Sequence, residues 1–300
     1  MGSSKKKFYK LNYKKIALVT GGAGFIGSHL CEALYNSGKY EVFSLDNYFT
    51  GFENNHVEGV TYIKGNSADI SILIDFTPDY VYHLGEYSRV EQSFEDIELV
   101  WKFNKDGIFA VLEFCVKTKA KLIYAGSSTK FGEGGLGRFQ SPYAWSKATN
   151  TELVKNYGNW YGLKYAITYF YNVYGPREIS QGKYATLIAL FIEKAKNNEP
   201  LTVVSPGTQR RNFTHVNDII KGIILVGEKG EGDDYGIGSP DSYSILEITN
   251  MFRNAKIEIL PERQGNRLNA EVITEKTIAL GWSPTLRIEN YIKNQRIISK

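Results

Sequence analysis

A glycine-spaced turn near the start of this 300-residue chain constrains its fold more than any other feature. The apolar run 16–19 has the length and composition of a buried parallel strand. The segment 20–27, Thr-Gly-Gly-Ala-Gly-Phe-Ile-Gly, follows it directly. Gly21 allows the tight turn, Gly24 lets the backbone approach a pyrophosphate, and Gly27 lets a helix pack closely on the strand. Because that helix aims its first N–H groups at phosphates, the turn predicts a dinucleotide-binding βαβ unit.

An acidic residue after the next apolar run indicates which dinucleotide is bound. The run 41–45 predicts a second strand, and Asp46 follows it, nineteen residues after Gly27. A carboxylate at this place binds the adenosine ribose hydroxyls. The next residue is Asn47 rather than an arginine, and a carboxylate without a nearby cation repels a 2′-phosphate. The sequence therefore predicts NAD rather than NADP as the cofactor.

Strand and helix patterns alternate through the first half of the chain. Strands are predicted over 15–20, 41–45, 60–64, 80–83, 121–126 and 165–170. Helices are predicted over 25–37, 69–75, 97–118 and 143–161. This alternation predicts an α/β fold with a doubly wound parallel sheet of the Rossmann type, which binds ligands at the carboxyl ends of its strands.

The ends of the predicted strands supply further candidate cofactor contacts. We expect five residues beside the cofactor in addition to those named above: Phe25, Ile26, Asn66, Ser67 and Leu84. Among these, the side-chain oxygen of Asn66 is expected to accept from the adenine amino group.

The regularity of the pattern decreases in the second half, which predicts a second, smaller lobe. We expect an NAD-binding Rossmann domain over 14–175, to which 212–238 returns. A nucleotide-sugar-binding lobe is expected from 176–211 and 239–300. Residues 1–13 are expected to form a basic N-terminal extension.

Lysines near the start of the chain account for its net charge of +4. Six of them precede residue 16, where no acidic residue occurs. The rest of the chain has thirty basic and thirty-two acidic residues, a balance of −2. This charge does not predict a nucleic-acid-binding surface on the body of the protein.

Cysteine and apolar patterning narrow the class further. Cys31 and Cys115 lie in apolar helical patterns without disulfide or metal spacing, which favours a reducing cytoplasm. The four histidines are scattered, so no metal site is predicted. No apolar run approaches membrane-spanning length, and no secretory signal is visible.

A tyrosine and a lysine four residues apart are the candidate catalytic pair. Tyr143 and Lys147 lie in the helix predicted over 143–161, and positions i and i+4 share one helix face. A free phenol titrates at about pH 10, and a nearby ammonium favours its ionised form. Ser127, at the end of the preceding strand, would hold a substrate oxygen. The pair alone is also common on surface helices, so the glycine turn is what favours a catalytic role.

Further motifs make the chain resemble the extended short-chain dehydrogenases/reductases of the NAD-dependent epimerase/dehydratase type, which act on nucleotide-diphosphate sugars. The resemblance covers essentially residues 14–295. Besides the glycine turn and the Ser-Tyr-Lys set, the motifs are His83-Leu84, Asn172-Val-Tyr-Gly-Pro176, 209–218, 261–267 and Leu280-Gly-Trp282.

The resemblance implies a role for each matching residue. Tyr143 would take the proton from a sugar hydroxyl, usually at C4, and Ser127 would bond the same oxygen. Lys147 would hold the nicotinamide ribose. The substrate diphosphate would be held by Asn172, Arg211 and Arg267, and guanidinium groups suit phosphate oxygens.

The residues after Ser127 depart from the pattern of sugar 4,6-dehydratases in this family. Those enzymes have an Asp-Glu pair directly after the catalytic hydroxyl, and elimination needs both carboxylates. This chain has Ser128 and Thr129 instead. Dehydration is therefore disfavoured, unless Glu86 supplies a carboxylate from another loop.

The loop 86–89 departs from the family as well, and it is expected to face the sugar. Its residues Glu86, Ser88 and Arg89, together with Ser128 and Thr129, are candidate substrate contacts. The alternative is that the loop is only a polar rim above the cofactor. Arg89 is a candidate site for a 2-oxo acid, a second substrate that would recycle the cofactor. With the segment 125–132, this loop resembles that of the bacterial C4 dehydrogenases that oxidise a GDP-linked manno-heptose for surface-polysaccharide synthesis.

The predicted activity is NAD-dependent oxidation of the C4 hydroxyl of a nucleotide-diphosphate sugar, giving a 4-keto sugar. A 4-epimerase uses the same three catalytic residues and stays open, and a 4,6-dehydratase comes third. A non-catalytic redox sensor would have lost Ser127, Tyr143 or Lys147, and all three are present. A homo-oligomer, a dimer or tetramer formed through the helices over 97–118 and 143–161, is expected from the resemblance.

Overall fold

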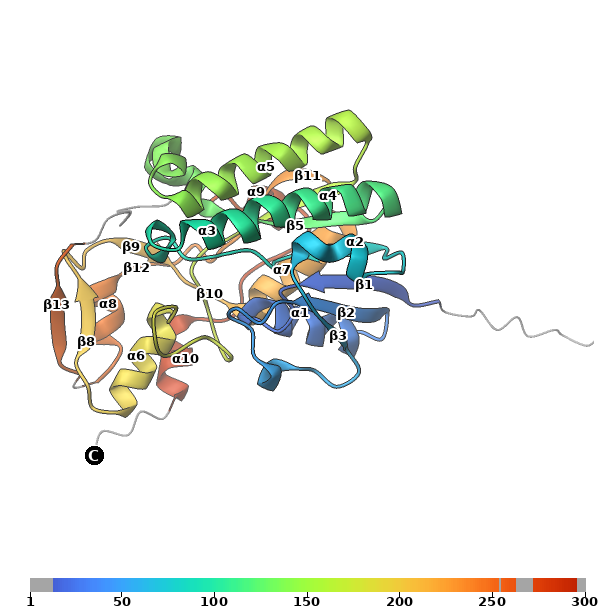
Figure 1. Cartoon of the computed structure of the whole chain (residues 1–300). Helices are drawn as coiled ribbons and strands as arrows, with labels where there is room; N and C mark the ends of the chain where they lie inside the picture. Colours follow the sequence, from blue (N-terminus) through green and yellow to red (C-terminus); the bar gives the residue numbers. More distant parts are fainter. Residues whose placement is uncertain (1–12, 254, 263–271, 296–300) are drawn as a thin grey trace, which may run out of the picture.

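The computed structural model describes residues 13–253, 255–262 and 272–295. One parallel sheet runs through the centre of this structure (Figure 1), with the strand order β11-β6-β5-β4-β1-β2-β3. Its strands are β1 (Lys15–Thr20), β2 (Tyr40–Asp46), β3 (Thr61–Lys64), β4 (Tyr80–His83), β5 (Lys121–Ser127), β6 (Tyr165–Phe170) and β11 (Gly232–Ile237). All neighbouring pairs in the sheet are parallel.

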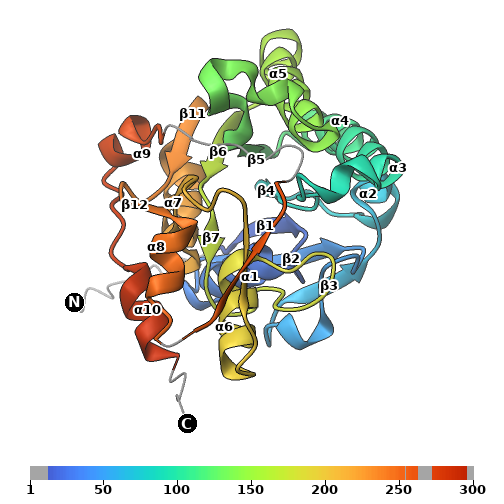
Figure 2. The same ribbon diagram turned by 90° about the vertical axis from the view of Figure 1, so that its left-hand side faces the viewer.

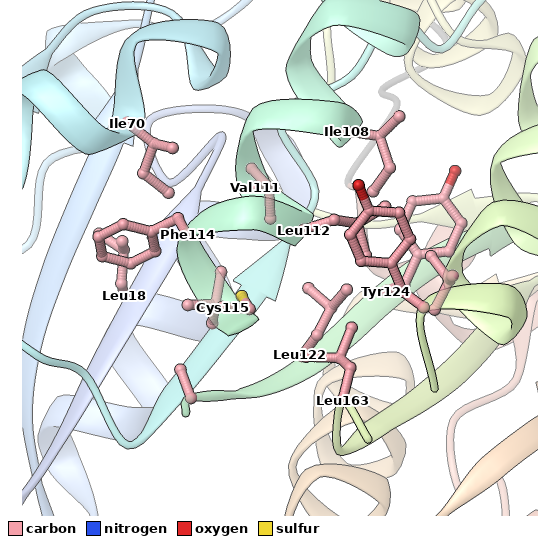
Figure 3. Packing of buried hydrophobic residues seen from close by; sticks show 14 of the residues in the cluster. Leu18, Ile70, Ile108, Val111, Leu112, Phe114, Cys115, Leu122, Tyr124 and Leu163 are labelled. Atoms are coloured by element: carbon pink, nitrogen blue, oxygen red, sulfur yellow. The ribbon is translucent and has the colours of Figure 1, made fainter. Parts of the chain in front are cut away.

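Both faces of the sheet are covered by helices, and the strands are therefore apolar on both sides. Successive side chains of a strand point to opposite faces. Leu18 packs with α4 and α5 on one face, while Ala17 and Val19 pack with α1 and α7 on the other. Figure 3 shows the first of these layers, in which Leu18 and Leu122 lie beneath the helices. The helices are α1 (Phe25–Asn36), α2 (Ile70–Leu73), α4 (Gly107–Thr118), α5 (Pro142–Tyr161) and α7 (Val216–Lys229).

Local sequence explains where the long helix α5 begins and ends. The Ser141 hydroxyl accepts from the Ala144 N–H at 3.0 Å and caps the N-terminus, and Pro142 occupies the first turn, where it lacks no needed N–H. Gly162, at φ 68°, ends the helix in the left-handed conformation. These caps fix the register that places Tyr143 and Lys147.

The helix predicted over 97–118 has three parts. It starts as α3 (Ile97–Val100), widens to the π-helical segment η4 (Trp101–Asp106) and continues as α4. π-helical segments are often found at functional sites, and Asn104 of this one bonds the backbone of Tyr87 near the catalytic residues.

Short helical turns connect many of the strands. They are η1 (Glu53–Asn55), η2 (Ser67–Asp69), η3 (Gln92–Phe94) and η5 (Ser128–Phe139).

Residues after the sixth strand are more regular than the sequence indicated. They form α6 (Leu187–Lys196), α8 (Ile245–Asn250), α9 (Glu275–Ala279), α10 (Ile288–Asn294) and the strands β7 (Val173–Tyr174), β8 (Leu201–Val204), β9 (Arg210–Asn212), β10 (Thr214–His215), β12 (Ser242–Ser244) and β13 (Ile257–Leu260). The last six strands form three two-stranded sheets. Their short apolar runs gave too little periodicity to be recognised.

Several of these elements surround an apolar core of their own, beside the carboxyl end of the large sheet (Figure 2). Phe191 of α6, Val203 of β8 and Ile248 of α8 belong to it. The segment 216–237, by contrast, forms α7 and β11 and pairs with β6 of the large sheet. Buried Asp218 of α7 accepts hydrogen bonds from the N–H groups of Thr285 and Leu286 at 2.8 Å, so it ties the two parts together.

The six strands predicted in the first half are confirmed, three of them with the predicted bounds and three with shifts of one residue at one or both ends, and the doubly wound sheet is confirmed with them. The structure adds β11 as a seventh strand. None of the described helices has the length and apolar character needed to cross a membrane.

Candidate active site

The carboxyl end of β1 opens into a cavity lined by the glycine turn on one side and by the catalytic residues on the other. β1 lies between β2 and β4, where the strand order reverses, and such a switch point is where doubly wound sheets bind ligands. Gly21, Gly24, Phe25, Ile26 and Gly27 all line the cavity, as predicted for backbone that faces a pyrophosphate.

The glycine turn leaves no room for larger residues, which fits a dinucleotide. Gly21 has φ +76°, and a Cβ on it would lie 2.9 Å from the Gly85 backbone. A Cβ on Gly27 would lie 2.0 Å from the Gly21 carbonyl oxygen. The turn is therefore closed tightly on itself, and the first residues of α1, Phe25 to Gly27, line the cavity beside it.

Asp46 secures the glycine turn from the end of β2. Its carboxylate accepts from the Ala23 N–H at 2.8 Å and from the Tyr48 N–H at 2.7 Å. Burial raises the pKa of Asp46, and these backbone hydrogen bonds oppose the rise. Asp46 and Asn47 line the cavity, so the carboxylate can both hold the turn and receive ribose hydroxyls.

The side-chain oxygen of Asn66, predicted to contact adenine, already accepts a hydrogen bond within the protein. The Asn66 Oδ1 atom accepts from the Asn47 Nδ2 atom at 3.0 Å. Contact with an adenine amino group would require this oxygen to accept a second hydrogen bond. Ser67 and Leu84, which were predicted with it, line the cavity.

Ser127, Tyr143 and Lys147 come together at the far side of the same cavity. The Tyr143 hydroxyl donates to Ser127 Oγ at 3.2 Å, and Ser127 Oγ also bonds Thr129 Oγ1 at 2.9 Å. Lys147 donates to the Ala125 carbonyl. Tyr143 and Lys147 both line the cavity, so a hydroxyl placed there reaches a phenol that a serine and an ammonium flank.

Glu86 lines the same cavity, but its carboxylate is held by partners within the protein, and its contact with a sugar stays a prediction. Its side chain is 3% exposed and forms an ion pair with Lys147. The carboxylate also accepts from Tyr124 Oη at 3.0 Å and Asn150 Nδ2 at 2.9 Å. Burial by itself would raise the pKa of Glu86, but the charges of Lys147 and His83 outweigh it and lower the pKa to about 2. The carboxylate therefore stays ionised and held, and it cannot serve as an acid for dehydration.

Arg89 lines the cavity and lies over the loop that follows β7. Its Nε and Nη2 atoms donate to the Tyr184 carbonyl at 3.1 and 2.8 Å, and its Nη1 atom donates to Ser88. No ion pair of Arg89 occurs among the described residues. The guanidinium is thus held by the Tyr184 carbonyl and by the backbone and side chain of exposed Ser88, and its charge interacts with that of Glu178.

A second cavity is lined by three of the eight predicted sugar and diphosphate contacts. Thr129, Asn172 and Arg211 line it, together with Gln209. Asn172 is held by a hydrogen bond from its Nδ2 atom to the Asn212 carbonyl at 3.1 Å. Ser128 is buried beside Ser127 and does not appear in the lining of either cavity. Arg267 lies outside the described residues.

Sequence reasoning missed the polar layer beneath the catalytic residues. Asn150 is fully buried and reaches Glu86 from α5. Its position three residues after Lys147 and seven after Tyr143 puts it on the same helix face, so the spacing held a usable signal. Tyr124, in an apolar strand pattern, held none. No cluster of three or more His, Cys, Asp or Glu side chains suited to a metal occurs in the described part of the chain.

Comparison with known proteins agrees with this geometry. The model of the NAD dependent epimerase/dehydratase family matches residues 17–238. A putative UDP-glucose 4-epimerase of Methanocaldococcus jannaschii is 31% identical over 92% of this chain and 98% of its own length. A UDP-N-acetyl-alpha-D-glucosaminuronate decarboxylase of Bacillus cytotoxicus is 34% identical over 78% of each chain. The crystal structure of the UDP-glucose 4-epimerase of Thermus thermophilus in complex with NAD superposes with a TM-score of 0.86, at 29% identity, over 93% of this chain and 96% of that one.

Proposed function

Because the chain belongs to the NAD dependent epimerase/dehydratase family of nucleotide-sugar enzymes, we propose that it oxidises the C4 hydroxyl of a nucleotide-diphosphate sugar and releases the 4-keto sugar. One observation supports this most directly. The Tyr143 hydroxyl contacts Ser127 Oγ beside Lys147, at the mouth of the NAD cleft, with Ser128 and Thr129 where a dehydratase needs carboxylates.

Each member of the trio has a separate task in this proposal. Tyr143 removes the proton from the sugar hydroxyl, and Ser127 holds that oxygen in line with the phenol. Lys147 holds the nicotinamide ribose and favours the ionised phenol. NAD, when bound, accepts the hydride from C4. General-base help of this kind increases the rate by about 10²–10⁴.

A 4-epimerase is the second candidate, and the likeness to UDP-glucose 4-epimerases supports it. An epimerase retains the ketone, rotates it, and returns the hydride to the other face. The trio serves both reactions equally. A dehydratase is less well supported, because the Glu86 carboxylate is engaged by Lys147, Tyr124 and Asn150.

The substrate that we propose is a GDP-linked manno-heptose, used for surface-polysaccharide synthesis in the cytoplasm. It rests on the resemblance of the loops 83–93 and 125–132, whereas the relatives named above act on UDP-linked sugars. We further propose that Arg89 receives the carboxylate of a 2-oxo acid that reoxidises the cofactor. Tyr184 and Ser88 engage four of its five N–H groups, so a carboxylate would accept from the remaining one or displace Ser88.

We propose a homo-oligomer that uses the outer faces of η4, α4 and α5. Trp101 and Trp145 stack there with ring centroids 5.9 Å apart, although each is partly exposed. Phe109 and Trp160 are more than half exposed. Apolar surface of this extent on neighbouring helices is typical of an interface, and sedimentation at two concentrations would measure the assembly.

Product identification tests the reaction. The protein is incubated with GDP-, UDP- and dTDP-linked sugars, and the products are identified by NMR. A retained 4-ketone on a GDP-linked heptose supports the proposal. Inversion at C4 identifies an epimerase, a 6-deoxy-4-ketone a dehydratase, and loss of CO₂ from a uronate substrate a decarboxylase.

The 2-oxo acid proposal has its own test. Arg89→Ala should abolish reoxidation of bound cofactor by 2-oxo acids, while the exposed Arg253→Ala control retains it. Unchanged turnover of Arg89→Ala with every 2-oxo acid acceptor would contradict the proposal.

A further inference from the structure

The catalytic lysine of this chain has a buried carboxylate directly beneath it, which the activity proposed above does not use. We propose that Glu86 is a counter-charge to Lys147, which positions the ammonium and weakens the positive field that Tyr143 and the nicotinamide experience. Glu86 is then a positioning residue that tunes the site rather than a group that touches the sugar. The inference concerns the same site as the proposed function and rests on it for the role of Tyr143.

The Lys147 ammonium is almost completely enclosed by this chain. Its side chain is 6% exposed. Of the three N–H donors of an ammonium, two are directed at Glu86 Oε2 and the Ala125 carbonyl, which leaves one for a ligand. The ammonium also lies 4.4 Å from the centroid of the Tyr124 ring. Lys147 therefore has one orientation, and Glu86 supplies the anchor with the strongest charge.

The Glu86 carboxylate is itself held from several elements. Tyr124 of β5 and Asn150 of α5 donate to it. His83 of β4 is fully buried, and its Nε2 atom lies 3.6 Å from Glu86 Oε1 without a hydrogen-bond partner. The other ring nitrogen of His83 bonds Thr20 Oγ1 at 2.7 Å. A buried carboxylate held by this many partners is pre-organised, so its charge acts at a fixed place.

Two further cations lie around the pair, and a carboxylate acts on each of them: Glu152 on Lys105 and Glu178 on Arg89. Lys105 of η4 donates to Asn150 Oδ1 at 2.9 Å, and the Arg89 guanidinium lies near enough to Tyr143 for their charges to interact. Of the ion pairs formed by the described residues, Lys147 takes part in the one with Glu86. Without Glu86, Lys147 would have no carboxylate in contact with it among the described residues.

The direction of both effects follows from Coulomb's law. An oxidised nicotinamide is a cation and a reduced one is neutral, so a nearby carboxylate favours the oxidised form. A carboxylate also disfavours the phenolate that Lys147 favours. Removing the Glu86 charge should therefore strengthen NADH binding relative to NAD⁺ binding, and should shift the acid limb of the pH profile to lower pH.

Binding measurements without any sugar test the first effect. The full-length protein is titrated with NAD⁺ and with NADH, and the ratio of the two Kd values is compared across variants. Glu86→Gln should change this ratio by about 10- to 100-fold in favour of NADH, as expected for one charge at this range. Glu86→Asp, which keeps the charge, should restore most of the wild-type ratio. Glu98→Gln, at an exposed glutamate of α3, is the matched control and should leave it unchanged.

The pH dependence of a single turnover with the accepted sugar tests the second effect. Its acid limb should lie at lower pH in Glu86→Gln than in the wild type and in Glu86→Asp. A merely structural role would lower the thermal stability or the rate, but would move neither the Kd ratio nor the acid limb. Glu86→Met, similar in size and neutral, replaces Glu86→Gln if the latter does not fold.

The two outcomes separate this inference from the proposed function. A Kd ratio within threefold of the wild type in a folded, neutral variant would overturn the counter-charge, whatever reaction the enzyme catalyses. Failure to oxidise any nucleotide sugar would overturn the proposed function, and the sugar-free binding ratio would still test the charge.

Discussion

The two sides of the cavity are built in different ways. The cofactor side consists of the glycine turn, held by its own backbone and by two hydrogen bonds to Asp46. The catalytic side consists of side chains from β4, β5 and α5, whose buried charges compensate one another. The cofactor side depends on glycines that have no side-chain atoms. The catalytic side depends on polar side chains that are all present and paired.

This difference predicts how each side responds to substitution. Added atoms should disturb the cofactor side, because an added Cβ would clash with backbone atoms that can move only if the turn opens. Removed charges or hydroxyls should disturb the catalytic side, because the groups left behind are buried without a partner. Substitutions on the cofactor side should therefore change mainly the affinity for NAD, and substitutions on the catalytic side mainly the rate of turnover.

The largest effect is expected for Tyr143→Phe. Loss of the phenol removes the proton acceptor and should lower the single-turnover rate by about 10²–10⁴, while the Kd for NAD stays within about threefold. NADH absorbance and a binding titration measure the two quantities. Tyr161→Phe, at an exposed tyrosine at the end of the same helix, is the control. A large loss of NAD affinity in Tyr143→Phe would break the distinction between the two sides.

Gly27→Ala should have the next largest effect, and the opposite signature. Its Cβ would lie 2.0 Å from the Gly21 oxygen, so the turn must open. We expect NAD affinity to fall by about 100-fold, which corresponds to about 2.7 kcal/mol, with the single-turnover rate largely recovered at saturating NAD.

The control for this substitution is Gly107→Ala in α4, where an added Cβ meets only ordinary contact at 3.5 Å. Alanine there should keep NAD affinity, since it also suits a helix better than glycine. Wild-type affinity in Gly27→Ala would show that the turn is looser than its geometry indicates.

The smallest effect is expected at a buried carboxylate that, unlike Glu86, has no ion pair among the described residues. Burial raises the pKa of Glu178 to about 7, against hydrogen bonds from Gly175 and Thr186 that lower it. Folded Glu178 thus holds its proton more tightly than the unfolded chain does. Its stabilising contribution is full below about pH 4.5 and is lost as the pH rises through 7.

Glu178→Gln should therefore be more stable than the wild type at pH 8, by about 1–3 kcal/mol, and equally stable at pH 5. Urea unfolding at several pH values measures the difference, with Glu199→Gln, at an exposed glutamate, as the control. If the free energy of unfolding depended on pH in the same way in the wild type and in Glu178→Gln, the prediction would be contradicted. Ionisation of Glu178 would then not destabilise the fold, as the ionisation of Glu86 beside Lys147 does not.

The fold was largely predictable because its signals are local. Each strand of the first half is a short apolar run bounded by turn residues, and a parallel sheet makes such runs apolar on both faces. The small sheets of the second half were missed because their strands carry no local signal of this kind. β9 and β12 have three residues each, too few for a period to show, and they form only because strands distant in sequence meet.

In the candidate site, too, the residues placed by local sequence were predictable and those placed by tertiary contacts were not. Gly21, Gly27 and Asp46 could be placed from spacing alone, since one turn and one strand end define their positions. That Tyr143 and Lys147 line the same cavity was predictable from helix periodicity. The position of Glu86 was not, because a charged residue in a loop is exposed by default, and only the tertiary structure brings the loop after β4 to Lys147 of α5.

By itself, the sequence determined the dinucleotide turn, the alternation of strands and helices, and the choice of the candidate catalytic trio, because each rests on neighbours along the chain or on one helical turn. The tertiary structure alone decided that Glu86 turns inward to Lys147 and that Arg89 is held by the Tyr184 carbonyl. The reason is physical. A charge takes the place where burial and its partners balance, and those partners come from strands and helices that only folding brings together.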